Sequence, residues 1–511
     1  MDTRKNRRIE ILAGVAGLLA LFTVSLAGSA ASGFSLDETW FLQVVSRVTN
    51  GEALYRDVFF LSTPLSVQVS VLVAHIFGAE LIVEKAVTSV AFVAELWFAD
   101  RLLRAIGAAR WSRWIAWMAL FVYTQHFPNP PYRTFGSALM LSSFWALTVS
   151  LRRSESGRDG AIRWLGIAGA LAGATFAAMP NHGLLSLGSI LVVALVQAHT
   201  AGASARVSAG AAAAVIMAFA VVMGLFLAPV LGHGAWTELL DYTIRNKGPY
   251  VRAGGASILT ELRTLLTINP LDGASLSRLY RGFGVVLVPV ALALTVVAAL
   301  RTSRDRRPLA LAIMLLVISS VAGAYPRLNR FHLSYASPAL IVGMVHSWMV
   351  LTAGLNVPRR AVRAFVAVWT IPGVLLTLAG TANAIGARDF VWSTVPHFTA
   401  IRMPAAEEEE IREQAARMRG VIGMQPLLVG THASLYYLAA GLSNPTPFDE
   451  SSVMSFGPRG QQQTIAAIAD GRVWPVCLEP LPGPLSPSTL ISYITSSMRR
   501  TEDLGICTVY R

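Results

Sequence analysis

The chain has 511 residues, of which 54% are hydrophobic and only 14% are charged, and its mean hydropathy is +0.54. Because soluble domains carry about 25% charged residues, much of the surface of this chain must face lipid. The apolar segments are about 20 residues long, as membrane-spanning helices are, whereas barrel strands need only about 9–11 residues of alternating polarity. The composition therefore excludes a disordered chain and predicts an α-helical polytopic membrane protein.

The net charge of +13 does not by itself indicate nucleic-acid binding, because the basic residues gather in short clusters between apolar segments. These clusters lie at 4–8, 152–153, 301–307 and 359–363. Such a distribution is typical of cytoplasmic loops under the positive-inside rule. No basic stripe with interleaved aromatic residues appears in the sequence. We therefore expect membrane lipids, and not nucleic acid, as partners of the basic residues.

The first apolar segment, about 9–31, follows the basic N-terminus and ends in small residues. A cleaved signal peptide ends in the same way, but this segment is long for one and many others follow it. We predict an uncleaved first helix whose N-terminus is cytoplasmic and whose C-terminal end is outside.

Further apolar segments follow along the chain. They start near Pro64, Val83, Trp114, Thr134, Ile162, Leu184, Val207, Phe283, Leu309, Tyr335 and Ala364. Alternating crossings place the polar stretches 32–63 and 231–282 outside, together with the tail, and place every basic cluster after residue 150 inside. The region 64–151 has one apolar segment too many for this topology, so one must be a half-span, for which the break at 128–131 is a candidate. We expect about 11 crossings in all.

Residues 1–385 therefore form the predicted transmembrane domain, and residues 386–511 a small soluble domain of α/β or α+β character. Within this tail, 407–419 has a helical pattern, 426–430 is a short apolar run typical of a buried strand, and 434–440 begins another helix.

Both cysteines of the chain, Cys477 and Cys507, fall in the tail. In an oxidising compartment they can form a disulfide; the alternative is a pair of buried free thiols. The absence of cysteine from the rest of the sequence favours the disulfide.

An acidic pair, Asp37 and Glu38, comes directly after the predicted first membrane exit. A carboxylate at this position can act as a general base toward a hydroxyl on the water side while a lipid-linked substrate approaches from the bilayer. The same spacing also suits an interfacial helix over 37–47, with Asp37 as its N-cap and Glu38 in its first turn. On spacing alone, the structural interpretation is favoured over catalysis.

Segments at both ends of the chain carry a resemblance to a known family. The string from Asp37-Glu38 through Gly51-x-x-Leu54-Tyr55-Arg56-Asp57 to Pro64-Leu65 resembles the first periplasmic loop of GT-C fold glycosyltransferases, in the branch of the protein O-mannosyltransferases and the lipid A aminoarabinose transferase. Segments similar to bacterial members of that group are 325–333, which includes Asn329 where related sequences often carry Asp, and 429–431, 436–441 and 444–446 in the tail.

The resemblance implies an enzyme of the bacterial inner membrane with a periplasmic C-terminal domain. It would transfer a sugar from a polyprenyl-phosphate-linked donor to an acceptor hydroxyl of a lipid, glycan or protein, with inversion of the anomeric configuration. Asp37 would be the catalytic base, and Glu38 would orient it or bind the acceptor. Asp57 is the second candidate for the base; its alternative role is an ion pair with Arg56 or a turn cap.

The departing phosphate needs a cradle of cationic or hydrogen-bonding groups. Few basic residues are expected on the outer side near helix ends, and they are Arg56, Arg245, Lys247, Arg327, Arg330 and His332. Arginine suits a phosphate because its planar fork binds two oxygens at once. The ordinary alternatives are lipid headgroups for Arg245 and Lys247, and snorkelling for Arg327.

Other polar residues fall in predicted outside turns. They are His126, Tyr132 with Arg133, and Asn181 with His182, and Tyr55 of the first loop is a further candidate. Because His182 follows Pro180-Asn181 and precedes Gly183, turn chemistry is its first explanation. The aromatic segment 436–441 is either an acceptor-binding surface or, as we favour, part of the core of the tail.

The sequence offers no motif for a cofactor. It has no Asp-x-Asp, no zinc-ligand spacing, no Gly-Lys-Ser/Thr phosphate loop and no dinucleotide-binding glycine motif. We therefore expect no cofactor, with a divalent metal left open but unsupported. A lipid-linked donor fits these absences better than a nucleotide sugar.

The main alternative is a transporter or flippase of a lipid-linked substrate. It predicts internal symmetry, and intramembrane charges or broken helices at matching positions. No repeat is found, and the charges concentrate at helix ends and in outside loops. A central cavity lined by Glu84, Lys85, Glu95 and Asp100 would favour the transporter.

Overall fold

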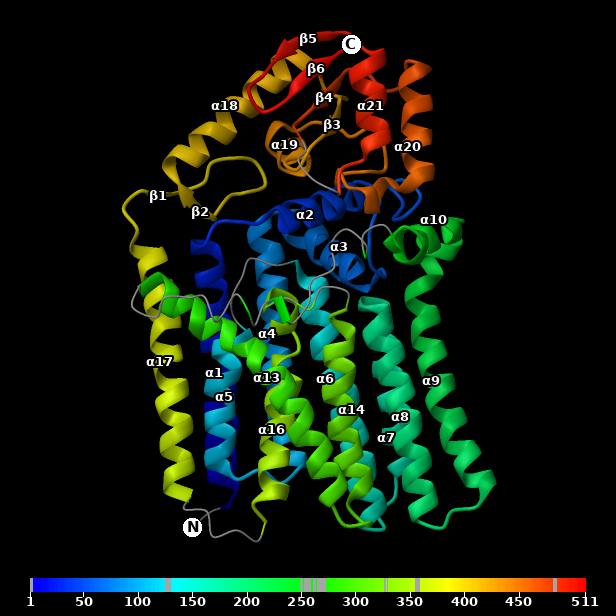
Figure 1. Ribbon diagram of the computed structural model, residues 1–511, viewed down its shortest axis with the longest axis vertical. Helices are drawn as coiled ribbons and strands as arrows, with labels where there is room; N and C mark the ends of the chain where they lie inside the picture. The colour runs from blue at the N-terminus through cyan, green and yellow to red at the C-terminus, as the bar shows by residue number, and fades with distance from the viewer. Residues whose placement is uncertain are drawn as a thin grey trace.

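A computed structural model describes residues 3–124, 130–248, 273–325, 330–353, 359–480 and 485–511, together with residues 251, 259, 260, 263 and 328. The described chain forms a long helical bundle with a smaller mixed α/β domain at one end (Figure 1). The N-terminus lies at the far end of the bundle and the C-terminus in the α/β domain, so the two termini lie at opposite ends of the long axis.

The bundle consists of helices that run mostly along the long axis. They are α1 (Thr3–Ala31), α4 (Leu81–Ala105), α5 (Arg110–Thr124), α6 (Pro131–Glu155), α7 (Ala161–Ala178), α8 (Pro180–Thr200), α9 (Ala205–Gly232), α13 (Gly273–Arg301), α14 (Arg307–Gly323), α16 (Ser337–Leu351) and α17 (Arg359–Gly386). Among the described residues, five of them are long and apolar enough to cross a membrane by length and composition: α1 from Gly14, α6, α7, α8 and α9. The protein is a multi-pass membrane protein, and the expected count of about 11 crossings stays a prediction.

Small residues bring two of these helices into close contact. Side chains at Gly169 and Gly173 on α7 would collide with the backbone of Val215 and Phe219 on α9. Without a hydrophobic driving force inside the bilayer, close backbone approach is a main source of helix association. The glycines therefore fix the spacing of α7 and α9.

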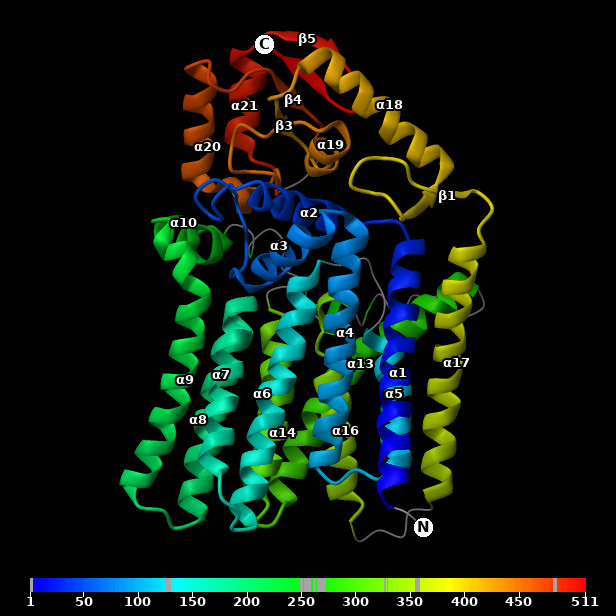
Figure 2. The same ribbon diagram turned by 180° about the vertical axis from the view of Figure 1, so that it is seen from behind.

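A layer of short helices separates the bundle from the α/β domain. It contains α2 (Leu36–Thr49), α3 (Leu65–Phe77), α10 (Trp236–Leu240) and the π-helical turn η1 (Asp241–Arg245), and α2 and α3 lie across the bundle axis in both views (Figures 1 and 2). The short helix α15 (Arg330–Ser334) precedes α16.

The extra apolar segment in 64–151 has a structural explanation. The segment that starts at Pro64 forms α3, whose 13 residues reach about 20 Å, less than the hydrocarbon thickness of about 30 Å. The break at 128–131, one candidate site for the half-span, lies partly outside the described residues. Helix α6 begins there, at Pro131, and continues for 25 residues.

The tail forms a mixed α/β domain. Its elements are β1 (Phe390–Trp392), β2 (Arg402–Pro404), α18 (Ala405–Ile422), β3 (Leu427–Val429), α19 (Ala433–Ala440), α20 (Val453–Ala469), β4 (Val476–Leu478), α21 (Ser488–Ser497), β5 (Arg500–Asp503) and β6 (Thr508–Tyr510). Strands β1 and β2 pair antiparallel. The main sheet has the order β3-β4-β6-β5, in which only β3 and β4 are parallel. Helix α19 is fully buried, so the aromatic segment 436–441 belongs mainly to the core of the domain.

Cys477 on β4 and Cys507 before β6 form a disulfide. Replacement of both by serine removes a constraint that closes a loop of 30 residues. We expect the free energy of unfolding of the domain to fall by about 3–4 kcal/mol. Maleimide labelling of the denatured protein should find no free thiol before reduction and two after it. Two reactive thiols without reductant would contradict the disulfide.

Candidate functional site

A cavity of about 840 Å³ lies between the end of the bundle and the α/β domain. Its walls come from the beginnings of α2, α6 and α8, from the end of α9 with α10 and η1, and from 430–452 of the α/β domain. This volume is within the range of about 300–1,000 Å³ that is usual for small-molecule sites. Segments from both ends of the chain thus meet at one site.

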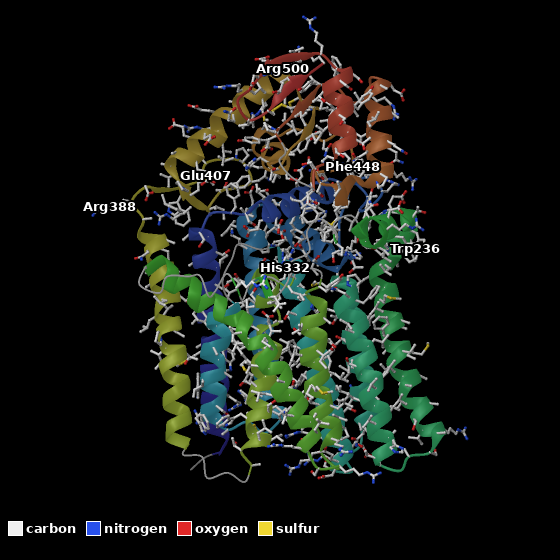
Figure 3. The ribbon with its side chains drawn as sticks, viewed as in Figure 1. Trp236, His332, Arg388, Glu407, Phe448 and Arg500 are labelled. Atoms are coloured by element: carbon white, nitrogen blue, oxygen red, sulfur yellow. A yellow bond between two sulfur atoms is a disulfide. The ribbon has the colours of Figure 1, made fainter. Side chains whose placement is uncertain are left out.

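The walls of the cavity differ in character. The side formed by α8, α9, α10 and η1 is mainly apolar: beside Asn181 and Thr243 it contributes Leu184, Leu227, Trp236, Leu239, Leu240 and Ile244. Charged residues from the first loop, the bundle and the η1 segment are Asp37, Arg133 and Lys247. Trp236 lies at the outer edge of the molecule (Figure 3), where it is half exposed, as is typical of a membrane–water interface.

Asp37 and Glu38 point to different environments. Asp37 is exposed and lines the cavity. Glu38 is buried: its Oε1 accepts a hydrogen bond from Lys85 Nζ at 2.9 Å, and its Oε2 accepts one from the Ser35 backbone at 2.9 Å. The N-cap of α2 is therefore Ser35, in a capping box with Glu38, and the expected cap at Asp37 is wrong. The Ser-x-x-Glu pattern of the capping box was the sequence signal for this.

The buried pair Lys85–Glu38 joins three helices at the end of the bundle. Lys85, on α4, is only 1% exposed and also donates a hydrogen bond to Ser29 Oγ of α1 at 3.2 Å. Loss of one member would leave the other charge buried without compensation, which is strongly destabilising. The pair therefore fixes the start of α2, and with it the position of Asp37. A role for Glu38 in binding the acceptor stays a prediction.

Arg133 brings a guanidinium to the cavity from the first turn of α6. Its Nε donates a hydrogen bond to Tyr132 Oη at 3.2 Å, and the guanidinium lies 5.4 Å from the centroid of the Tyr132 ring and 5.7 Å from that of Tyr335. It also interacts electrostatically with Asp37. The sequence placed Arg133 in an outside turn but did not rank it for phosphate binding. The available signal in the sequence was its position in a predicted outside turn, directly before an apolar segment.

Lys247 enters the cavity from the segment that follows η1. Burial lowers its pKa to about 8. Among the described residues no carboxylate forms an ion pair with it. Its neighbour Arg245 instead points outward, is 61% exposed and pairs with Asp241 at 2.8 Å. Of the two predicted phosphate ligands in this loop, only Lys247 reaches the cavity.

Arg56 and Asp57 satisfy each other. The guanidinium of Arg56 donates hydrogen bonds of 2.9 and 2.8 Å to the two carboxylate oxygens of Asp57, and this contact lowers the pKa of Asp57. Asp57 also accepts a hydrogen bond from the Ala53 backbone at 2.9 Å. Neither residue lines the cavity, and the ion pair is the structural alternative considered for Asp57.

Of the other polar candidates, Asn181 lines the cavity, and its Nδ2 donates a hydrogen bond to the carbonyl of Gly323 at 2.6 Å. Three further candidates, Tyr55, His182 and His332, do not line it. Tyr55 is fully buried and donates a hydrogen bond to the carbonyl of Ser62 at 2.6 Å. His182 is buried against Gly323 of α14. His332, at the end of the bundle nearest the α/β domain (Figure 3), does not line the cavity. Arg327 and the side chain of Arg330 lie outside the described residues.

The described residues show no metal site. No group of three or more His, Cys, Asp and Glu side chains among them is placed to hold a metal ion. The chemistry available in the cavity is that of carboxylates, a guanidinium, an ammonium and hydroxyls.

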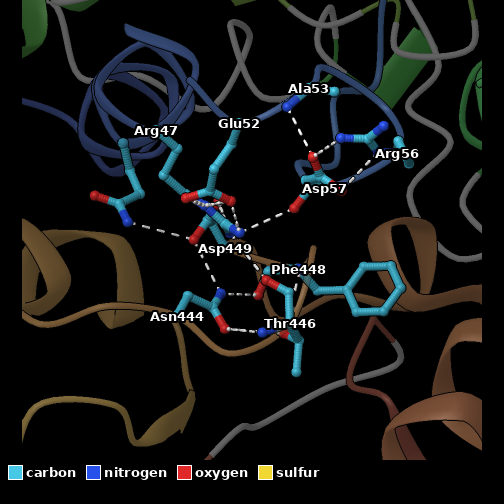
Figure 4. A network of polar contacts seen from close by, with 10 residues as sticks. Arg47, Glu52, Ala53, Arg56, Asp57, Asn444, Thr446, Phe448 and Asp449 are labelled. Carbon is cyan, nitrogen blue, oxygen red and sulfur yellow. Dashed lines mark hydrogen bonds and ion pairs between the residues drawn. The ribbon is translucent and has the colours of Figure 1, made fainter. Parts of the chain in front are cut away.

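Arg47 of α2 joins the first loop to the α/β domain (Figure 4). Its guanidinium donates hydrogen bonds of 2.9 Å to Asp449 Oδ2 and to the carbonyl of Thr446. It also donates to the carboxylate of Glu52 and to the carbonyl of Asp57. The first-loop and tail segments that carry the family resemblance therefore meet at this arginine.

Hydrogen bonds within the α/β domain hold the Asp449 side chain in position for Arg47. Asn444 Nδ2 donates to Asp449 Oδ1 at 2.9 Å, and Asn444 Oδ1 accepts from the backbone and hydroxyl of Thr446, both at 2.9 Å. Nearby, the ring of Phe448 packs 6.2 Å from that of Tyr242 in η1, at the boundary of the α/β domain and the helices below (Figure 3). Contacts among α2, η1 and the α/β domain thus hold three parts of the chain together beside the cavity.

The bundle and the α/β domain together resemble solved membrane proteins, although no protein-family model and no curated protein matches the sequence. ArnT from Cupriavidus metallidurans bound to undecaprenyl phosphate aligns with a TM-score of 0.58 at 14% identity, over 98% of this chain and 98% of that chain. The apo state of the same protein aligns with a TM-score of 0.59 at 13% identity, again over 98% of both chains. The chain has the GT-C fold. The fold expected from the first loop is confirmed, and the likeness in fold includes the α/β domain.

Within this GT-C fold, removal of the Arg47 side chain should weaken the contact between α2 and the α/β domain. Arg47→Met leaves the carboxylate of Asp449 buried without its partner, and we expect a loss of about 3–5 kcal/mol in the free energy of unfolding. Thermal unfolding of the detergent-solubilised protein measures it. Arg245→Met is the matched control, because an exposed ion pair contributes only about 0–1 kcal/mol. Equal stability losses in the two variants would contradict the role of Arg47.

Proposed function

We propose that this protein is a glycosyltransferase of the bacterial inner membrane that takes a sugar from a polyprenyl-phosphate-linked donor. The observation that carries the proposal is the cavity, in which Asp37, Arg133 and Lys247 line one space with an apolar wall on one side. Undecaprenyl phosphate, the molecule bound in the structure of ArnT, has the same two parts, a phosphate and an apolar chain. Its chain would lie against α8, α9 and α10, and its phosphate against the two cations.

The reaction is a single displacement. The oxygen of an acceptor hydroxyl attacks the anomeric carbon, the bond between that carbon and the phosphate oxygen breaks, and the lipid phosphate leaves with the electron pair. Asp37 accepts the proton of the hydroxyl as general base. Arg133 and Lys247 stabilise the charge on the departing phosphate. Because the nucleophile enters opposite the leaving group, the anomeric configuration inverts.

The distribution of basic residues indicates on which side of the membrane the cavity lies. The basic clusters at 152–153 and 301–307 belong to the ends of α6, α13 and α14 that lie farthest from the α/β domain (Figure 1). The positive-inside rule makes that end cytoplasmic. The cavity and the α/β domain are then periplasmic, and the disulfide suits an oxidising compartment.

The transporter alternative receives no comparable support. None of Glu84, Lys85, Glu95 and Asp100 lines the cavity. Asp100 pairs with Arg104 at 2.6 Å and lies 3.7 Å from Arg113, while Lys85 pairs with Glu38. Lys85 and Asp100 lie near the two ends of α4 and take part in ion pairs, whereas Glu84 and Glu95 are buried along the same helix. Because none of the four charges lines the cavity, the transferase is favoured.

Replacement of the proposed base tests the reaction. Asp37→Asn should reduce sugar transfer, or hydrolysis of the donor, by about 10²–10⁴-fold, while the affinity for undecaprenyl phosphate stays within a few-fold. The assay uses the purified protein with a panel of polyprenyl-phosphate sugars. Asp57→Asn is the matched control, since that carboxylate lies outside the cavity. If activity is kept in Asp37→Asn and lost in Asp57→Asn, the general base is Asp57 and not Asp37.

The ammonium of Lys247 predicts a pH dependence for donor binding. Burial lowers the pKa of Lys247 to about 8, so the cation that binds phosphate is present below this pH and lost above it. The affinity for undecaprenyl phosphate should therefore fall as the pH rises from 7 to 9.5. In Lys247→Met we expect binding about tenfold weaker at pH 7 and independent of pH over this range.

Titration calorimetry or fluorescence measures these dissociation constants. Arg245→Met is the control, because its guanidinium is exposed and points away from the cavity. The same slope of affinity with pH in Lys247→Met as in the wild type would exclude Lys247 as the phosphate ligand.

A further inference from the structure

Helix α20 of the α/β domain contacts the segment that brings Lys247 to the cavity. This segment is η1, which begins at Asp241 directly after α10. In both views α20 lies beside α10 (Figures 1 and 2). The exposed guanidinium of Arg459 on α20 donates a hydrogen bond of 3.2 Å to the carboxylate of Asp241. The start of η1 is therefore linked to α20.

The end of η1 contacts α20 more closely. Asn246 is the C-cap of η1, and its backbone N–H donates to the carbonyl of Asp241 at 2.9 Å. The side-chain amide of Asn246 packs on the backbone of Gly457. A β-carbon added to Gly457 would lie 2.6 Å from Asn246 Cγ and would also overlap with the oxygen and nitrogen of the amide, whereas non-bonded carbons approach to about 3.5–4.0 Å. Gly457 therefore cannot carry a side chain unless Asn246 moves.

The backbone of Gly457 has a conformation that favours glycine. Its φ of 55° and ψ of −179° interrupt the helical geometry inside α20, and residues with a side chain rarely adopt them. Pro458 follows, and a residue before proline is disfavoured in the helical region. The kink presents the backbone of Gly457 to Asn246, so the amide of Asn246 can lie directly on α20.

A third contact between η1 and the α/β domain is aromatic. The ring centroid of Tyr242 in η1 lies 6.2 Å from that of Phe448. Phe448 in turn packs 4.5 Å from Phe456 of α20. The domain thus holds both the helical turn and its cap. Lys247 comes directly after Asn246 and lines the cavity, so its position depends on a turn that α20 fixes.

We infer that Gly457 is a positioning residue for the donor phosphate, because its contact with Asn246 places the ammonium of Lys247 in the cavity. The inference rests on the proposed function, in which Lys247 binds that phosphate. The Cα atoms of Asn246 and Lys247 are about 3.8 Å apart across one peptide unit, so a shift of the cap also shifts the lysine. The α/β domain then contributes to donor binding through a residue that does not line the cavity.

Amine labelling as a function of pH tests where Lys247 lies. The chain has three lysines, Lys5, Lys85 and Lys247, so mass spectrometry of fragments resolves Lys247 after competitive acetylation of the full-length protein in detergent. In the wild type the midpoint should lie near the lowered pKa of about 8. In Gly457→Ala and in Asn246→Ala it should rise to about 9 or higher, toward the pKa of an exposed lysine of about 10.4, because the ammonium becomes hydrated.

The other charged side chains that line the described cavity wall are Asp37, Arg133, Asp449 and Glu450. They are the same in all of these variants, so a change in the pKa of Lys247 reports a change in its own position.

The affinity for undecaprenyl phosphate is the second readout. At pH 7, Gly457→Ala should weaken binding by a factor approaching the loss of about tenfold expected for Lys247→Met. The fall in affinity between pH 7 and 9.5 should also become shallower. General destabilisation of the fold would change neither this pH dependence nor the labelling midpoint.

Gly471→Ala is the matched control. Gly471 also has a positive φ, of 69°, but nothing in the described chain beyond its neighbours lies within 4 Å of an added β-carbon. This variant should keep the wild-type midpoint and affinity. In the Asn246→Ala background, Gly457→Ala should add less than about twofold to the loss of affinity, because the amide with which it collides is gone. Asn246→Ala alone carries the test if Gly457→Ala does not fold.

The outcomes separate the two proposals. A labelling midpoint of Lys247 that stays at the wild-type value in Gly457→Ala and Asn246→Ala overturns the inference. A shifted midpoint with unchanged affinity, or an equal shift in Gly471→Ala, overturns it as well. If the wild type neither binds undecaprenyl phosphate nor uses any polyprenyl-phosphate sugar, the proposed function fails and Lys247 is no phosphate ligand, while the labelling still decides whether Gly457 positions the lysine.

Discussion

The buried guanidinium of Arg47 connects helix α2, which follows the first helix of the bundle, with the α/β domain. Its partners are Glu52 and the carbonyl of Asp57 on one side, and Asp449 and the carbonyl of Thr446 on the other. A guanidinium can serve all of them at once because its five donors lie in one plane. Both α2 and the α/β domain contribute residues to the cavity wall, so the geometry of the cavity depends on this contact.

Helix α2 carries both Arg47 and Asp37, so the contacts that hold this helix also position the carboxylate of Asp37. Its N-terminal turn is fixed by the capping box of Ser35 and Glu38 and by the buried pair between Glu38 and Lys85. Asp37, next in sequence to Glu38, belongs neither to the capping box nor to the buried pair, and it lines the cavity. The two neighbouring carboxylates therefore have different roles. Glu38 stabilises the start of α2, and Asp37 faces the site proposed for the substrate.

Much of the fold could be predicted from the sequence, because apolar length and basic clusters report directly on a membrane bundle. The first loop also indicated the GT-C fold, and the short run 427–429 was recognisable as a strand. The site was harder. Arg245 ends η1 and Lys247 follows two residues later, and nothing in the sequence indicates that only Lys247 lines the cavity while Arg245 is exposed and pairs with Asp241. The contact of Arg47 with Asp449 spans 402 residues, and no local pattern marks either of them as a partner.

A structure of the protein with undecaprenyl phosphate bound tests most directly whether this cavity receives the donor. The phosphate should lie within hydrogen-bond distance of Arg133 and Lys247, with the polyprenyl chain against α8, α9 and α10 and the phosphate within reach of the sugar position beside Asp37. Arg245 and Arg459 of α20 are both exposed and both pair with Asp241. A phosphate bound beside these two arginines, on the outer surface, would contradict the assignment of the cavity as the site of sugar transfer.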